Sequence, residues 1–216
     1  MQSRRQLLAE VAVVAVTALV GLAFLDQLPA EVAIHFGPGG SPDDYAARSV
    51  ALALIPALQV GMIALFAVLP RLDPLGENIR QFARAYDGFV LALLGFLGYV
   101  HALVVLWNVG YEFPITMALA PAMAVFYYAI GALVEEAEQN WFVGFRTPWT
   151  LSNEQVWADT HAIAGKLMRG AAVLTLGALA LPEYAMAFLV GPVVAVAVFA
   201  TVYSYWDYRQ IEAAAA

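Results

Sequence analysis

The sequence contains no cysteine, and charged residues make up only 12% of its 216 residues. The missing thiols exclude disulfides, thiolate metal sites, iron-sulfur clusters and cysteine nucleophiles. Lysine occurs once and the formal net charge is −7, which argues against a broad basic face for nucleic acid. We therefore expect no direct contact with nucleic acid. We also expect no cofactor and no bound metal.

Hydrophobic residues, in contrast, make up 62% of the chain. A helix needs roughly 20 residues to cross the hydrocarbon core of a bilayer, and six apolar segments qualify or come close. The fifth has only fifteen residues, with Arg169 near its start, so it must borrow length from the helix before it or lie partly at the interface. The six segments are Leu7–Leu25, Val50–Leu69, Phe89–Trp107, Pro114–Val134, Leu167–Leu181 and Tyr184–Tyr205.

The positive residues predict the orientation of these spans, because cytoplasmic loops hold an excess of lysine and arginine. With the N-terminus inside, only Arg48 lies outside. We therefore predict an all-α integral membrane protein in the lipid bilayer of the cell membrane, with six transmembrane helices and both termini in the cytoplasm. The nine positive residues on the cytoplasmic side are Arg4, Arg5, Arg71, Arg80, Arg84, Arg146, Lys166, Arg169 and Arg209.

A long connection, Asp26–Ser49, is external in this topology. Its glycine-rich run at 37–40 must turn, because proline fixes φ and glycine permits conformations that other residues resist. Ser41 then reads as the N-cap of the second helix, with Pro42 in its first turn. His35, held near Asp43 by the turn, is compatible with a metal site, a pH-sensitive ion pair, a partner surface or a loop held by hydrogen bonds.

The second long connection, Glu135–Lys166, is internal and contains the polar stretch GFRTPWTLSNEQVWADTH. Ser152 and Gln155 have the spacing of a capping box, which predicts a helix start. Trp157, His161 and Gly165 then recur every four residues and so share one face of that helix. We expect this helix to lie along the cytoplasmic membrane surface and to lead into the fifth span.

Prolines lie inside the second, fourth and sixth spans, about 10 Å from their outer ends at 1.5 Å per residue. Pro56, Pro121 and Pro192 each free a backbone carbonyl and can kink their helix. Three kinked hairpins could enclose a small cavity, although prolines are also simply tolerated in membrane helices.

Two motifs carry a resemblance to a known family. The run GFRTPWTLSNEQVWADTHAIAGKLM resembles the signature of the SdpI family of membrane immunity proteins. The run LPAEVAIHFGPGGSPDDYAAR, followed by LIPAL, is similar to the N-terminal domain that commonly accompanies it, although Pro38 is an insertion in its glycine turn. The resemblance covers nearly the whole chain and implies a two-span domain at 1–85 and a four-span domain at 86–216.

The resemblance implies a non-enzymatic inner-membrane protein that protects its cell against a secreted toxic peptide. The resemblance also implies a cytoplasmic transcriptional repressor as a candidate partner. The residues expected to recognise these partners, or to shape the surfaces that do, are His35, Phe36, Gly40, Pro42, Asp43, Arg146, Thr147, Pro148, Trp149, Thr150, Trp157 and His161.

Two other classes of function remain open from the residues alone. A small-solute or proton-coupled transporter would use Glu10 and His101, the ionisable residues set in or near the spans, but they fall near opposite faces of the membrane. An intramembrane glutamate-type protease would use Glu135-Glu136 with Arg146 and His161. Its spacing is wrong, because the arginine follows ten residues after Glu136 and no histidine follows His161.

Overall fold

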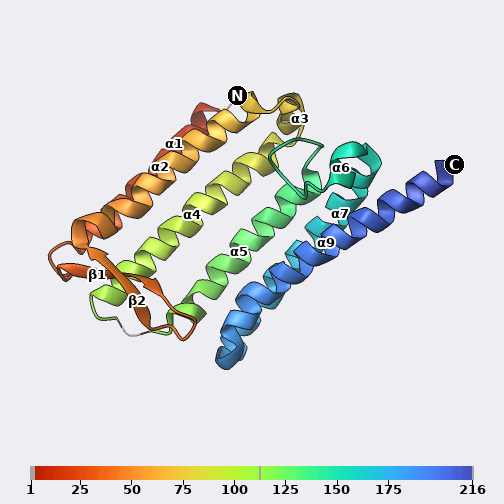
Figure 1. The fold of residues 1–216 in the computed structure, drawn as a ribbon. Coiled ribbons are helices and arrows are strands. Elements are labelled where there is room, and N and C mark those ends of the chain that lie inside the picture. The colour runs from red at the N-terminus through yellow and green to blue at the C-terminus, as the bar shows by residue number, and fades with distance from the viewer. Residues whose placement is uncertain (1–2, 112, 216) are drawn as a thin grey trace.

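The computed structural model describes residues 3–111 and 113–215, and these residues are mostly helical (Figure 1). Among them, six helices are long and apolar enough to cross a membrane, so the number of predicted spans agrees with the structure. The elements in chain order are α1 (Arg4–Ala23), β1 (Glu31–Phe36), β2 (Pro42–Ala47), α2 (Arg48–Leu72), α3 (Gly76–Gln81), α4 (Ala83–Asn108), α5 (Ile115–Glu136), α6 (Pro148–Ser152), α7 (Glu154–Thr175), α8 (Gly177–Ala180), η1 (Pro182–Tyr184) and α9 (Ala185–Ala215).

The long helices form one bundle with two distinct ends (Figure 1). The hairpin of β1 and β2 lies at one end, which we call the hairpin end. The connection between α2 and α4, the short helix α6, the first turn of α1 and the last turns of α9 lie at the other, which we call the α6 end. The two long connections predicted to carry recognition therefore lie at opposite ends of the bundle.

The fifth span borrows its length from the segment that precedes it. Helix α7 runs without a break from Glu154 to Thr175, and α8 continues the same apolar span to Ala180. Residues 154–166, predicted to form a helix along the membrane surface that leads into the fifth span, are continuous with that span in one helix. The only helix between α5 and α7 is α6, which has five residues.

The hairpin departs from the predicted all-α architecture. β1 pairs antiparallel with β2, with Ala33 opposite Tyr45. Pro42 and Asp43, predicted to begin the second helix, lie instead in β2, and α2 begins only at Arg48. Ser41 is therefore not an N-cap; it lies in the turn, where its carbonyl accepts a hydrogen bond from the Gly37 N–H at 2.9 Å.

Helix α4 joins the two halves of the bundle, because it packs against α1 and α2 on one side and α5 on the other. α7 in turn packs between α5 and α9. The contact of α5 with α7 is close at Gly131 and Gly165, where an added Cβ would lie only 2.6–2.8 Å from atoms of the facing helix. Two glycines in register allow this approach, a common device where membrane helices meet.

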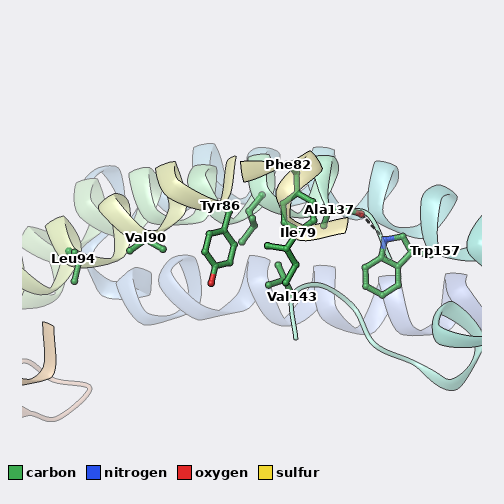
Figure 2. Packing of buried hydrophobic residues seen from close by; sticks show 9 residues of the cluster. Ile79, Phe82, Tyr86, Val90, Leu94, Ala137, Val143 and Trp157 are labelled. Atoms are coloured by element: carbon green, nitrogen blue, oxygen red, sulfur yellow. Dashed lines mark hydrogen bonds between the residues drawn. The ribbon is translucent and has the colours of Figure 1, made fainter. Parts of the chain in front are cut away.

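The largest buried apolar cluster ties the α6 end together (Figure 2). It brings side chains of α3, α4, α5 and α7, and Phe82 between α3 and α4, against two residues of the loop that precedes α6. Many leucines and valines elsewhere on the long helices are exposed, as the lipid-facing surface of a membrane bundle requires. The members of the cluster are Ile79, Phe82, Tyr86, Val90, Leu94, Leu133, Ala137, Val143 and Trp157.

Candidate functional sites at the two ends of the bundle

The RTPWT run forms a capped turn that begins α6. The Thr147 hydroxyl accepts from the Thr150 N–H at 3.2 Å, while the Thr150 hydroxyl accepts from the Thr147 N–H at 2.9 Å. These reciprocal bonds form a capping box, and Pro148 occupies the first turn, where its missing N–H costs nothing. Local backbone chemistry therefore explains Thr147, Pro148 and Thr150 of this run.

The predicted capping box of Ser152 with Gln155 is wrong. Ser152 is the last residue of α6, and its hydroxyl donates to the Trp149 carbonyl at 3.1 Å. Asn153 caps α7 instead, because its side-chain oxygen accepts from the N–H groups of Gln155 and Val156 at 2.9 and 3.2 Å. Serine and asparagine are both good caps, so the sequence alone did not separate two adjacent candidates.

Side chains of this turn connect it to α9 and to the preceding loop. The Thr147 hydroxyl lies 3.1 Å from the Ser204 hydroxyl, and the Trp149 ring lies 5.0 Å from that of Tyr205. The fully buried Thr150 hydroxyl donates to the Phe145 carbonyl at 2.7 Å. These contacts make the turn part of the α7–α9 packing.

Trp157 and His161 lie on one face of α7, as their spacing predicts, and the structure shows that this face is buried. The Trp157 Nε1–H donates to the Ala137 carbonyl at 2.6 Å (Figure 2). The His161 ring stacks on the indole, and its Nε2 accepts from the Phe145 N–H at 2.9 Å. Its Nδ1 lies 2.8 Å from the Trp157 carbonyl and therefore carries the ring proton, so the hydrogen bonds require a neutral imidazole.

Gly144 allows the loop to pass over this ring pair. Its φ is +112°, and a Cβ at this position would overlap His161 Nε2. Trp157, His161 and Thr150 are thus buried and can act only through the shape of the segment. Arg146 and Pro148 are exposed, and Arg146 Nη1 donates to the Trp141 carbonyl at 2.6 Å. Among the predicted residues of the segment, these two are the most available to another molecule, while Thr147 and Trp149 are half-buried.

At the hairpin end, the predicted residues His35 and Asp43 do meet. Nδ1 of His35 lies 2.5 Å from Oδ1 of Asp43, and both side chains are more than half exposed. Gly40 adopts a φ of +78° in the turn, which explains the glycine there. Phe36 packs edge-on against Trp107 of α4, with ring centroids 5.0 Å apart.

One residue that fixes the hairpin was missed from the sequence. Asn108, at the last position of α4, accepts from the Ala33 N–H at 2.9 Å and donates to the Ala33 carbonyl at 3.0 Å. The side-chain amide of Asn108 thus bonds to the edge of β1 as the backbone of a third strand would. The only sequence signal was a polar amide at the end of an apolar run.

The protease arrangement is not assembled. Glu135 forms an ion pair with Arg169 of α7, while Arg146 is bound to the loop backbone. Among the described residues, no group of three or more acidic or histidine side chains is placed to hold a metal ion.

The two residues considered for a transporter, Glu10 and His101, are both buried. Glu10 accepts a hydrogen bond from Gln6 Nε2 at 2.9 Å, and His101 lies against Gly21 of α1.

Taken together, the fold defines a multi-pass helical protein of the cell membrane. The hairpin of β1 and β2 lies at one end of the bundle, and the stacked, buried pair of Trp157 and His161 lies toward the other. Residues 136–204 match the model of the SdpI/YfhL protein family, and residues 12–60 match a domain of unknown function, DUF1648. The chain therefore carries an SdpI/YfhL-type domain and the accompanying N-terminal domain, so the resemblance predicted from the two motifs is confirmed.

A curated relative is similar over almost the full length. The immunity protein SdpI of Bacillus subtilis (strain 168) is 22% identical over 200 residues, which is 92% of this chain and 94% of that protein. No solved structure shows a significant match.

Proposed function

We propose that this protein protects its cell against a secreted toxic peptide, which it binds at the hairpin end. The observation that carries the proposal is the similarity to an immunity protein along nearly the whole chain, including both motif-bearing connections. The hairpin supports it, because it presents His35 and Asp43 to the surroundings on a scaffold held by Asn108.

We further propose that both termini and the α6 end face the cytoplasm, so that the hairpin end faces the toxin. The lysine and arginine distribution supports this orientation. We keep the division into a two-span unit at 1–85 and a four-span unit at 86–216 as part of the proposal. The matches at 12–60 and 136–204 fall on either side of that boundary.

A cytoplasmic repressor is the proposed second partner, and it would contact the exposed part of the α6 segment. Arg146 and Pro148 are exposed there, together with the aromatic side chains of Trp141 and Phe142. Binding outside can affect binding inside only if the helices have two arrangements that the two partners favour differently. Pro56, Pro121 and Pro192, inside α2, α5 and α9, are the candidate points of bending.

The experiment that tests the immunity role is heterologous expression followed by challenge with the native secreted peptide. Survival of cells that express the protein, with no ion flux in proteoliposomes and no cleavage of the peptide, supports a binding role. Flux or cleavage would assign the protein to a transporter or a protease. Equal killing of expressing and non-expressing cells would overturn the proposal.

Substitutions then separate recognition from scaffold. His35→Ala and Arg146→Ala should reduce protection or signalling while leaving the amount of membrane protein unchanged. If they change only expression, these residues are scaffold. For the relay, Pro56→Ala, Pro121→Ala and Pro192→Ala should weaken the response to toxin, and an unchanged response in the triple variant would count against it.

A further inference from the structure

An apolar hollow of about 460 Å³ lies beneath the hairpin. The hairpin contributes Phe36 and Pro38, and α4, α5 and α9 contribute the remaining walls. Its volume is within the range of roughly 300–1,000 Å³ that is usual for ligand sites. Pro56, Pro121 and Pro192 do not line it, so it differs in position from the cavity expected from kinked hairpins. The apolar side chains from the helices include Leu103, Ile115, Leu119, Met186 and Leu189.

The hollow joins parts of the chain that are far apart in sequence. His35 and Phe36 come from the connection after α1, while Met186 and Leu189 come from the last helix. Gly40, in the hairpin turn, approaches Ile115 at the start of α5, since its Cβ would lie 3.9 Å from Cγ2 of that side chain. A ligand in this position would contact both the hairpin and the four-span half of the bundle.

Exposed carboxylates lie close to residues that line the hollow, because Asp43 contacts His35 and Asp44 is the partner of His35 in the hairpin register. Asp43 and Asp44 lie on β2, and Glu183 lies in η1, three residues before Met186. Within described residues 24–50, 109–111, 113–114 and 176–184, the only arginine or lysine is Arg48. That guanidinium donates to the Leu25 and Leu28 carbonyls, at 3.0 and 3.1 Å. The imidazole of His35, in the lining, contacts Asp43. Carboxylates still outnumber the positive groups, so the surroundings of the hollow are negative.

We propose that this hollow receives the apolar side chains of a cationic amphipathic peptide, whose positive residues face Asp43, Asp44 and Glu183. The proposal rests on the immunity role and names the chemistry of the peptide that would be bound. An apolar interior beside carboxylates favours such a peptide. The same carboxylates repel the phosphate of a phospholipid, which disfavours a lipid chain as the occupant.

The test uses the full chain in phosphatidylcholine nanodiscs. Because the protein has no cysteine, Met186→Cys can be labelled alone with an environment-sensitive fluorophore. The probe is a synthetic amphipathic peptide of leucine and lysine, and a leucine and glutamate peptide with the same apolar pattern is its control. We expect a saturable emission change with the lysine peptide only. A label at Val125→Cys, which is 65% exposed on α5 and does not line the hollow, should not respond.

Two further sets of variants test the contributions of the carboxylates and of the cavity separately. Glu183→Gln should weaken binding about two- to threefold, and the triple variant Asp43→Asn, Asp44→Asn and Glu183→Gln about tenfold, as expected for exposed charge pairs. Val190→Trp, which fills the hollow from α9, should abolish the response, whereas Val125→Trp should not.

Equal binding of the two peptides, no saturable response, or binding unaffected by Val190→Trp would each overturn the proposal. An emission change on exchange of phosphatidylcholine for phosphatidylglycerol, without peptide, would assign the hollow to a lipid chain. Protection of cells by the Val190→Trp variant would overturn this site and leave the immunity role intact. Peptide binding by a protein that gives no protection would support this site and overturn the immunity role.

Discussion

The imidazole of His161 lies face to face with the indole of Trp157, with ring centroids 3.9 Å apart and an angle of 14° between the ring planes. Each ring also makes a hydrogen bond to the loop before α6, through the Ala137 carbonyl and the Phe145 N–H. This pair therefore holds a polar loop against a membrane helix, and its contribution is to folding of the segment.

His161→Ala should lower the free energy of unfolding by about 2–4 kcal/mol, because it removes buried ring packing and leaves the Phe145 N–H without its acceptor. His35→Ala is the matched control, since it removes only an exposed ion pair worth less than about 1 kcal/mol. Denaturant unfolding of the detergent-solubilised protein, followed by helical circular dichroism, measures both. Equal losses in the two variants would contradict the structural role of His161.

Gly144→Ala should destabilise the same loop by about 1–3 kcal/mol, because alanine resists a positive φ and its Cβ would overlap the His161 ring. Gly170→Ala is the control on α7, where an added Cβ meets no atom within 4 Å. There alanine should be neutral or stabilising, since it favours the helix. The comparison requires only thermal unfolding of the two purified variants, and a stable Gly144→Ala protein would refute the expectation.

The Glu135–Arg169 ion pair should couple α5 to α7 energetically. Arg169 also lies over the Tyr128 ring, 5.8 Å from its centroid. Both charged side chains are 26–33% exposed, so we expect less than for a fully buried pair, with a coupling of about 1–2 kcal/mol. A double-mutant cycle of Glu135→Gln and Arg169→Met measures it, and additive effects of the two substitutions would show that no coupling exists.

Asn108→Ala should release β1 from α4 without unfolding the bundle, because both hydrogen bonds to Ala33 are lost. Amide hydrogen exchange at Ala33 should accelerate about tenfold or more, as expected for the loss of about 1–3 kcal/mol of local stability. Asn108→Asp keeps the acceptor and removes the donor, so it should give an intermediate rate. Unchanged exchange in Asn108→Ala would mean that the hairpin is held by its apolar contacts alone.

Much of the fold followed from the sequence, since six apolar runs correspond to the six long helices. The hairpin did not, because Ser41-Pro42-Asp43-Asp44 satisfies the rules for a helix start. β1 had a usable signal: Val32, Ile34 and Phe36 alternate with less apolar residues, as in a strand. β2 has no such pattern, and it forms because β1, held by Asn108, offers it a partner.

For the candidate sites, the sequence predicted which residues gather but not how they are used. The spacing of Trp157 and His161 placed both on one face of a helix. It did not reveal that this face is buried, because burial depends on the loop that Gly144 carries over the rings. His35 and Asp43 were expected to be neighbours, and they meet across two strands of a hairpin and not at a helix start.

Helix α9 has 31 residues, and its last turns extend past the rest of the bundle (Figure 1). At 1.5 Å per residue it is about 46 Å long, which exceeds the roughly 30 Å thickness of the hydrocarbon core. Its first turns border the hollow beneath the hairpin, through Met186 and Leu189. The helix is therefore long enough to connect the hollow with the membrane surface at the α6 end.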